Sequence, residues 1–578
     1  MGSARDERLW LHVLFAAALT SAVTSSEVSA KENKLRSDLE KELPTTAVAY
    51  HEAPGDHARR RAYADLLFQL GNMWPANDVI APMATVASAN THDLALAARL
   101  ALMLGDYDRA ERLFQRLSEV ADKHSTDHGK AISGLVLTYY QTNQYAKAKN
   151  LKLPELGSQS RRLGTLLTFM QKFEGAPYQI EWANADKVAR LKMINDIRAP
   201  AALPLMNLEI NGQPVQFILD TGGDQLYIDR DVAQKLGIKT IHQRQAAYVY
   251  TKGKTVNEPL GVAESVKLGE VTLKNVPVVV ATWKSFGVPG DGVVTTQVLK
   301  QFLSTIDYER AEITLRERSE PGHKQMLESF AGKKAHRMPF FLSGTHMMFT
   351  HGSLNGRKGL DLFMDSGLAM TVPLIVHEET AKDLGLKRDP AAGAQRVIYP
   401  IDSHGVGELT RGKTRALGNV RLGADPYWSS GFIFDALISH QYLYHLRSWT
   451  IDFDTMTYYF PSDIKEDVPS QANAKKPTET KKEVVAKDSP NPLKRFVGPY
   501  KCEAIKTEVE FTLTGDQLSF TASGNLRGRF TLKKLAENTY EAEDTPQKVT
   551  VVFKLRDAKV TEAELTVSGQ GPFVFKRG

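Results

Sequence analysis

The chain has 578 residues, which at roughly 100–200 residues per domain predicts about three to five domains. Hydrophobic residues make up 42% and charged residues 24%. This ordinary globular composition excludes collagen-like, fully disordered and polytopic membrane proteins. The net charge of +6, from 73 basic and 67 acidic residues, is too dispersed to predict nucleic-acid binding. A single cysteine, Cys502, excludes an internal disulfide framework and a CxxC metal cluster.

Residues 1–30 have the features of a secretory signal peptide. The apolar run Leu9–Val23 is too short for a comfortable membrane span, and a small-x-small cleavage motif follows at 28–30. An uncleaved anchor or a buried helix is the alternative, because acidic residues offset the nearby arginines. The segment predicts export, with a bacterial periplasm as the expected location and no transmembrane span once the signal is removed.

Residues 31–190 are predicted to form a helical domain, because Leu and Ala recur at three- and four-residue spacing from 35 to about 175. The segment Leu104–Tyr107, followed by Ala110 and Phe114, resembles the end of the first helix of a tetratricopeptide repeat. Gly71 lies 34 positions before Gly105, which is the period of that family. A generic helical bundle is the alternative. Stacked helical repeats usually bind protein segments, so a protein partner is expected on this domain.

After about residue 197 the sequence changes to short apolar strands broken by Gly, Asn and Pro, which predicts a central all-β region up to about 461. Residues 462–492 contain no aromatic residue and are predicted to form a disordered linker. Residues 493–578 alternate again and predict a small antiparallel β-barrel or sandwich. Their opening segment Phe496–Tyr500 resembles the start of the lipocalin-like β-domain of some penicillin-recognising serine hydrolases. The predicted fold class is therefore multidomain α+β.

Two segments of the central region share one motif, an apolar strand followed by aspartate, a hydroxyl residue and glycine. These are the triplets Asp220-Thr221-Gly222 and Asp365-Ser366-Gly367. One such triplet is also a common strand-end turn and is weak alone. The second triplet follows the first by 145 positions, and Thr450-Ile451-Asp452 follows Thr305-Ile306-Asp307 by the same number. The repeat predicts a duplicated domain, with a first half at 197–318 and a second half at 338–461.

Each half resembles a lobe of a retropepsin-like aspartic protease, and the pair resembles the two-lobed, pepsin-like arrangement in one chain. The resemblance implies an aspartic endopeptidase that acts on a peptide or protein substrate, with Asp220 and Asp365 as the catalytic residues. The resemblance also implies supporting loop residues and candidate flap aromatics, namely Thr221, Gly222, Ser366 and Gly367 in the loops and Tyr248, Tyr250 and Tyr399 in the flaps.

The implied chemistry needs neither metal nor cofactor. Two carboxylates about 3 Å apart share one proton, so that one activates water while the other polarises the scissile carbonyl. The histidines show no recognisable metal-binding motif, and Asp224 is interpreted as a local capping group. A shared-proton pair in an apolar setting predicts a bell-shaped pH profile with an optimum at about 5 to 6.5.

The sequence departs from the family pattern behind both triplets. The family's usual alanine after the triplet is Gly223 in the first half and Leu368 in the second, and a later glycine is Thr295 and Ser439. These departures motivate a second hypothesis, a non-catalytic periplasmic binding or scaffold protein that retains the protease fold. Retention of both complete triplets favours the enzyme.

Overall fold

The computed structural model covers the full chain and describes most of it. The described residues are 34–86, 89–153, 157–197, 202–247, 255–282, 284, 289–330, 335–369, 372–392, 397–407, 409–418, 431–461, 492–502, 507–514, 517–522, 528–543, 549–556, 559–567 and 570–577. The predicted signal peptide and nearly all of the predicted linker lie outside them. Two compact units are present, one within residues 6–469 and one within 470–578, and each is described by itself.

The larger unit begins with a helical region, residues 36–172. Its elements are α2 (Arg36–Glu52), α3 (His57–Gln69), α4 (Met73–Thr85), α5 (Thr91–Met103), α6 (Tyr107–Val120), α7 (Thr126–Gln141), η2 (Tyr145–Ala148) and α8 (Gly157–Lys172). The side chains of Asp56 and Ser125 accept backbone N–H groups at the start of α3 and α7, as helix N-caps do.

Three alternate helices end in the same way. Gly71, Gly105 and Asn143, which follow α3, α5 and α7, have positive φ angles of 76°, 80° and 59°. This left-handed conformation closes a helix C-terminus and suits glycine or asparagine. N-terminal helices in an α+β multidomain chain are thus confirmed, and the tetratricopeptide assignment stays a prediction.

The first half contains an eight-stranded sheet in the order β1-β8-β5-β9-β4-β3-β7-β6. Its elements are β1 (Gln179–Trp182), β3 (Leu205–Ile210), β4 (Gln213–Asp220), β5 (Leu226–Asp229), α9 (Arg230–Lys235), β6 (Lys239–Ala247), β7 (Thr255–Leu268), β8 (Val271–Ala281), β9 (Gly292–Thr295) and α10 (Thr296–Leu299). Asn211 and Gly212 both have positive φ and make the tight turn into β4.

The second half contains a nine-stranded sheet in the order β17-β20-β16-β21-β15-β14-β18-β19, with β13 paired to β14. Its elements are β13 (Phe341–Ser343), β14 (Met347–Leu354), β15 (Arg357–Met364), β16 (Leu374–Val376), α12 (Glu378–Asp383), η5 (Pro390–Ala392), β17 (Ile398–Ile401), β18 (His404–Val406), β19 (Leu409–Arg411), β20 (Thr414–Gly418), β21 (Ala436–Ile438) and α13 (His440–Tyr444). Asn355 and Gly356 repeat the positive-φ turn.

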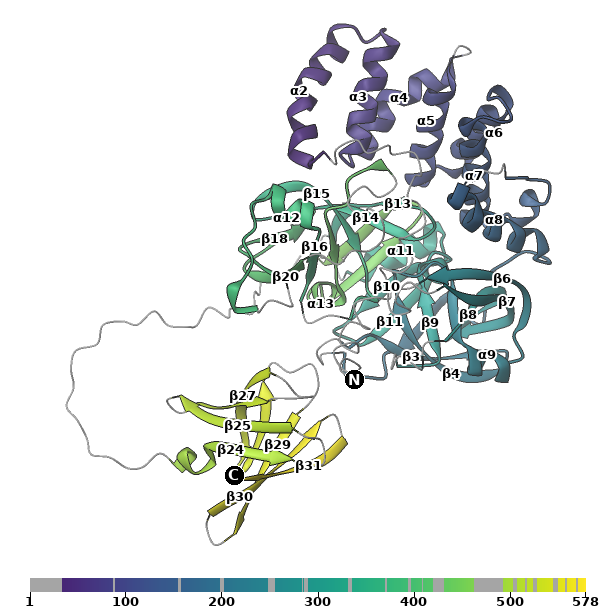
Figure 1. The fold of residues 1–578 in the computed structure, drawn as a ribbon. Helices are drawn as coiled ribbons and strands as arrows, with labels where there is room; N and C mark the ends of the chain where they lie inside the picture. The colour runs from purple at the N-terminus through teal and green to yellow at the C-terminus, as the bar shows by residue number, and fades with distance from the viewer. Residues whose placement is uncertain are drawn as a thin grey trace. The chain divides into compact units, whose positions relative to one another are not determined.

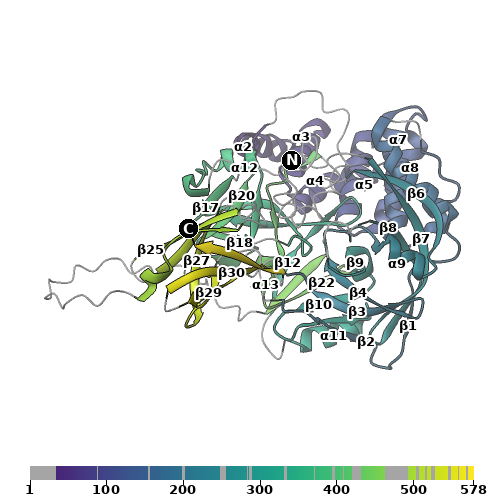
Figure 2. The same ribbon diagram turned by 60° about the horizontal axis from the view of Figure 1, so that its bottom comes forward.

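A six-stranded sheet, visible in Figure 2, joins the two halves. It has the order β12-β23-β22-β10-β11-β2 and consists of β2 (Val188–Lys192), β10 (Leu303–Asp307), β11 (Glu312–Arg316), β12 (Ala335–Pro339), β22 (Ser448–Asp452) and β23 (Thr457–Pro461), with α11 (Glu320–Glu328) between β11 and β12. Thr305 lies opposite Thr450 in this sheet, and their hydroxyl oxygens are 2.8 Å apart. Matched positions of the duplication therefore meet each other, as related copies do about a two-fold axis.

The boundary predicted at residue 190 is wrong. Strand β1 pairs with β8, and β2 pairs with β11, so residues 179–192 belong to the sheets and not to the helical region. No side chain of β1 is buried. Strand β1 therefore lacks the alternation of buried and exposed side chains that is typical of a half-buried strand.

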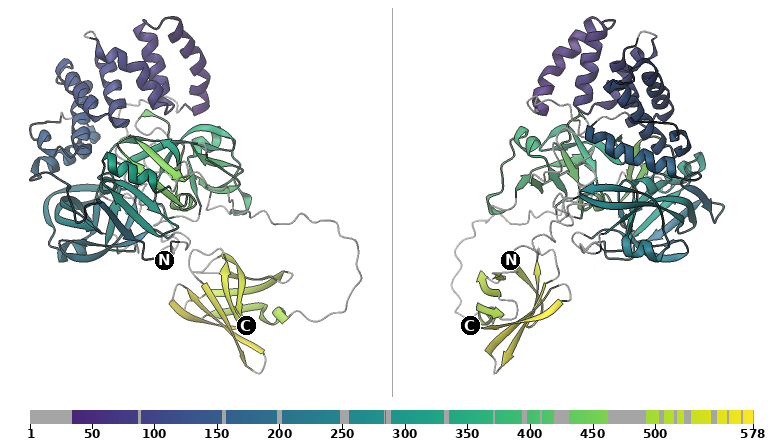
Figure 3. Two further views of the ribbon diagram at one scale, coloured as in Figure 1. Left: turned by 180° about the vertical axis from the view of Figure 1, so that it is seen from behind. Right: turned by 45° about the vertical axis from the view of Figure 1, so that its right-hand side comes forward.

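The helical region lies along one side of the two halves, as the views in Figures 1 and 3 agree. Its contacts with them are buried and polar as well as apolar. The guanidinium of Arg36, 2% exposed, donates to Asp435 at 2.6 Å and to Asp361 at 2.7 Å. A single apolar cluster also runs from the helices into both halves, including Phe68 and Phe432. The helices are thus an integral layer of this unit.

The smaller unit is a closed antiparallel barrel preceded by η7 (Pro492–Phe496). Its strands are β24 (Gly498–Cys502), β25 (Thr507–Thr514), β26 (Gln517–Ala522), β27 (Gly528–Ala536), β28 (Thr539–Glu543), β29 (Val549–Arg556), β30 (Lys559–Val567) and β31 (Gln570–Arg577). Buried aromatic side chains, including Phe511 and Phe553, fill a core of its own. Within the described part of the chain, no helix combines the length and apolar character needed to cross a membrane.

Candidate active site

Both triplets follow strands that lie inside their sheets. Asp220 ends β4, which runs parallel to β9, and Asp365 follows β15, which runs parallel to β21. Both aspartates have no exposed surface. The Gly222 N–H donates to Oδ1 of Asp220 at 2.6 Å, and the Gly367 N–H donates to Oδ1 of Asp365 at 2.9 Å. Each carboxyl group is therefore held by its own loop in the same way.

The hydroxyl residues of the two triplets bind each other's loops. The Thr221 N–H donates to Oγ of Ser366, and the Ser366 N–H donates to Oγ1 of Thr221, both at 2.9 Å. The Thr221 hydroxyl donates in turn to the Met364 carbonyl at 3.1 Å. These reciprocal bonds fix the two loops against each other, so the two carboxyl groups cannot separate without breaking them.

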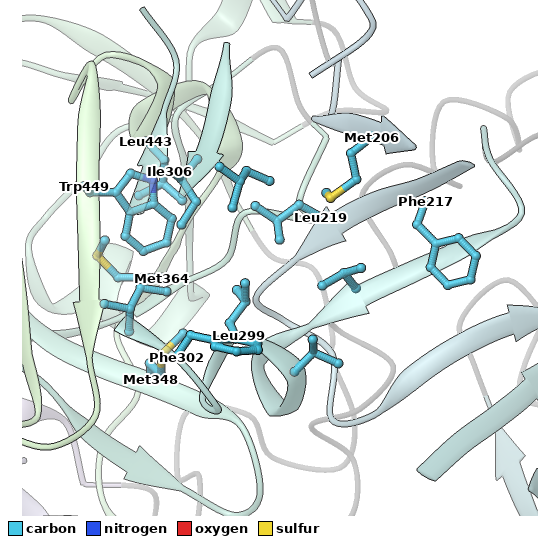
Figure 4. Packing of buried hydrophobic residues seen from close by; sticks show 14 of the residues in the cluster. Met206, Phe217, Leu219, Leu299, Phe302, Ile306, Met348, Met364, Leu443 and Trp449 are labelled. Atoms are coloured by element: carbon cyan, nitrogen blue, oxygen red, sulfur yellow. The ribbon is translucent and has the colours of Figure 1, made fainter. Parts of the chain in front are cut away.

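The second loop passes directly against the first carboxyl group. A Cβ atom on Gly367 would lie 2.0 Å from Cγ of Asp220, so only glycine fits at this position. Leu219 and Met364, the residues before the two aspartates, belong to one buried apolar cluster with Ile306 and Trp449 (Figure 4). The aspartates thus share a water-poor setting formed by both halves.

This setting changes the acidity of both groups. Burial raises the pKa of Asp220 to about 6. Burial and the neighbouring charge of Asp220 raise the pKa of Asp365 well above its usual range. Within the described residues, Oδ2 of each aspartate has no hydrogen-bond partner. Two interacting carboxyl groups with raised pKa values are the kind of pair that can share one proton.

The two departures from the family pattern in the first half compensate for each other. A Cβ atom on Gly223 would lie 2.4 Å from Cγ2 of Thr295, so the glycine makes room for the threonine. The Thr295 hydroxyl donates to the Gln225 carbonyl at 2.8 Å. In the second half the Ser439 hydroxyl donates to the Val372 carbonyl at 2.7 Å. Both hydroxyl residues are thus satisfied, and they tie down the chain that follows each triplet.

Asp224 is more than the local capping group expected from the sequence. Its carboxylate accepts a hydrogen bond from Tyr227 at 2.5 Å and lies 3.3 Å from the guanidinium of Arg244 on β6. Its backbone carbonyl accepts a hydrogen bond from the Tyr140 hydroxyl of α7 at 2.8 Å. Asp224 therefore links the first loop to strand β6 and to the helical region, a role with no signal in the sequence.

Of the three flap aromatics predicted from the sequence, the structure describes only Tyr399. Tyr248 and Tyr250 lie outside the described residues, between the paired strands β6 and β7. Tyr399 is a buried residue of β17 opposite Ala416, and a Cβ atom on Gly418 would overlap its ring at 2.2 Å. Tyr399 is therefore a core residue of the second half. Buried and less buried side chains alternate along β17, and Tyr399 is one of the buried ones.

One cluster of metal-type ligands occurs in the described residues. Atoms of His323, Asp452 and Asp454 lie within 4.8 Å of one another. The Arg318 guanidinium forms an ion pair with Asp454, and Asp452 accepts the N–H groups of Asp454 and Thr455. Both carboxylates thus have hydrogen-bond or ion-pair partners within the protein and do not need a metal ion to balance them.

Comparison with known proteins supports the protease family. Residues 206–298 match the Aspartyl protease family. That range contains Asp220-Thr221-Gly222, strand β3 from its second residue, and strands β4 to β9.

Among solved structures, a retropepsin-like aspartic protease from Rickettsia conorii is 18% identical. The match covers 25% of this chain and 96% of that one, with a TM-score of 0.17. Basic 7S globulin from soybean is 10% identical, and the match covers 48% of this chain and 97% of that one, with a TM-score of 0.30. No curated protein sequence matches the chain.

Proposed function

We propose that the chain is an aspartic endopeptidase whose catalytic pair is Asp220 and Asp365. One observation carries the proposal. The aspartates of two triplets 145 positions apart act on each other's pKa and are clamped by reciprocal Thr221–Ser366 hydrogen bonds. The match of residues 206–298 to the Aspartyl protease family supports the same chemistry.

The two groups take complementary roles in this mechanism. Asp220 has the smaller rise in pKa and is the base, which removes a proton from water through Oδ2. Asp365 stays protonated and donates a hydrogen bond to the scissile carbonyl. When the tetrahedral intermediate collapses, the proton passes to the leaving amine and the pair returns to its one-proton state. The apolar surroundings make these charge interactions stronger than they are in water.

The pKa of Asp220 alters the expected pH dependence. The base loses its proton only above about pH 6, so the lower limb of the activity profile lies near that value. The optimum moves from the mildly acidic range towards neutrality.

Both carboxyl groups are fully buried, so a substrate reaches them only from a state in which the site has opened.

We further propose that the enzyme acts outside the cytoplasm, in a periplasm, on a peptide or protein substrate. Support for this location comes from the signal-like segment at residues 1–30 alone. The two halves then function as pepsin-like lobes, each contributing one aspartate.

The second candidate is a non-catalytic binding or scaffold protein that retains the protease fold. The complete burial of both carboxyl groups favours it. The clamped loops and the effect of Asp220 on the pKa of Asp365 favour the enzyme, because a binding protein has no need of two buried acids that destabilise each other.

Incubation with a denatured proteome, followed by mass spectrometry of new termini, separates the two candidates. The wild-type protein should generate new termini that Asp220→Asn and Asp365→Asn proteins do not. A matched control is Asp291→Asn, which changes a partly exposed aspartate ion-paired with Lys284 and should leave cleavage unaltered. Absence of cleavage by the wild-type protein from pH 5 to 8 would support the binding protein.

A further inference from the structure

The end of helix α7 occupies a specific place between the two halves. Gln141, its last residue, is 3% exposed. Its amide Nε2 donates to the carbonyls of Gly344 and Thr345 at 3.2 and 2.9 Å. These carbonyls lie in the turn between β13 and β14 of the second half. The amide group of one helical residue is thus anchored to the second half by two hydrogen bonds.

The acceptor atoms of the same residue face the first half. Lys300 directly follows α10. Its buried amine donates to the side-chain Oε1 and the backbone carbonyl of Gln141. Burial lowers the pKa of this amine well below its usual value. Its described partners are these oxygens and the face of the Tyr107 ring, 5.0 Å away. Gln141 therefore bridges the two halves through opposite ends of one amide.

The bridge is continuous with the catalytic loop. Helix α10 carries Thr296, whose hydroxyl donates to the Thr221 carbonyl at 2.6 Å. Thr221 is the residue that grips Ser366 of the other half. Two neighbouring contacts reinforce the junction, one between Asn143 and Gln301 at 2.8 Å and one between the Tyr140 hydroxyl and Asp224.

We propose that Gln141 is a positioning residue, and that with Lys300 it forms a bracket that holds the two halves at the spacing their aspartate pair requires. The C-terminal end of α7 then helps to position the aspartate pair, whereas the rest of the helical region is not required for this role. At this end the face of the helical region is turned to the protease halves and not to a foreign partner. The kinetic part of the proposal rests on the proposed function.

The bracket has two arms: the hydrogen bonds of the Gln141 amide to the second half, and the hydrogen bonds of the Lys300 amine to Gln141. Two substitutions remove these arms separately. Gln141→Glu keeps an acceptor for Lys300 but replaces the amide donor with a carboxylate, which the carbonyls of the second half repel. Lys300→Met keeps the length of the side chain and removes the donor of the first half. A matched control is Gln171→Glu, because Gln171 also donates to three carbonyls, all within the helical region.

The bracket predicts a loss of turnover that the control does not share. Since a displacement of about 1 Å in a catalytic pair costs up to about a hundredfold in rate, each arm variant should lower kcat at least tenfold with little change in KM. A looser pair repels its second charge less, so the upper limb of the pH profile should move to lower pH. The double apolar variant Gln141→Met/Lys300→Met should be no slower than either single variant, because a bridge is lost when either arm is lost.

A second measurement decides the proposal without activity. If the bracket keeps the carboxyl groups together and dry, Asp220→Asn should stabilise the wild-type protein at pH 8 more than it stabilises the Gln141→Glu protein. Equal stabilisation in both proteins would overturn the bracket, as would unchanged kcat and pH profile in Gln141→Glu. If Gln141→Glu does not fold, the double apolar variant replaces it in both measurements. Absence of hydrolysis by the wild-type protein would count against the proposed function alone.

Discussion

The buried aspartate pair should destabilise the protein that carries it. Asp220 is fully buried, and its pKa rises from 3.8 to about 6. A carboxyl group with a raised folded-state pKa gives its full stability below the unfolded-state pKa and loses it as the pH rises through the folded-state value. Each pKa unit corresponds to about 1.4 kcal/mol. Ionisation of Asp220 should therefore lower the free energy of unfolding by about 3 kcal/mol at pH 8.

Asp220→Asn removes this penalty, because asparagine stays neutral and can still accept the Gly222 N–H. The variant should be more stable than the wild-type protein by about 3 kcal/mol at pH 8 and by roughly half as much at pH 5. Tryptophan fluorescence during urea unfolding can measure this, since the barrel sequence contains no tryptophan and Trp449 lies in the joined core. The inactive protein is thus expected to be the more stable one.

Asp454→Asn is the control with the opposite sign. Burial acts to raise the pKa of Asp454, but the hydrogen bond and charge of Arg318 outweigh it and lower the pKa. Asparagine at this position should therefore cost stability at pH 8. The reasoning fails if Asp220→Asn is no more stable than the wild-type protein at pH 8, or if its gain does not shrink towards pH 5.

Three further outcomes follow from other parts of the chain. Burial lowers the pKa of His377 and His404 to about 4 and of His440 to about 3. Stability is therefore lost as the pH falls below 6.5, and His440→Phe should recover about 2 kcal/mol at pH 5 in urea unfolding. Arg36→Met leaves two buried carboxylates without their cation and should cost about 3–5 kcal/mol by the same assay at pH 7. Residues 492–578 should fold alone with protected amides in hydrogen exchange, because the barrel has its own core; exchange like that of an unfolded chain would refute this.

The sequence is most informative where the chain repeats itself. The spacing of 145 between the triplets also separates Thr305 from Thr450, and those two residues meet in the joined sheet. A duplication predicts such pairings, because related copies bring the same position to their common axis. The triplets themselves are recognisable in the sequence because each combines the end of an apolar strand with an aspartate and a glycine. The glycine is required where the loop of one half passes close to the carboxyl group of the other.

The contacts of the helical region could not be predicted in this way. Gln141 and Lys300 are separated by 159 positions and belong to no repeat or motif, and each alone is an ordinary polar residue of a helix end. Arg36 could not be predicted either. It follows the signal-like segment, and the charged residues around it are typical of a solvent-exposed helix start. Long-range polar pairs leave no periodic pattern in one sequence, so their burial is apparent only from the structure.

The pH dependence of kcat tests the aspartate pair most directly. Turnover of a cleaved peptide should be measured from pH 4 to 9 for the wild-type, Asp220→Asn and Asp365→Asn proteins, with and without a metal chelator. The wild-type profile should be bell-shaped with a lower limb near pH 6, insensitive to the chelator and lost in both variants. A rate that keeps rising above pH 8, a rate abolished by the chelator, or full turnover by either variant would contradict catalysis by a shared-proton pair.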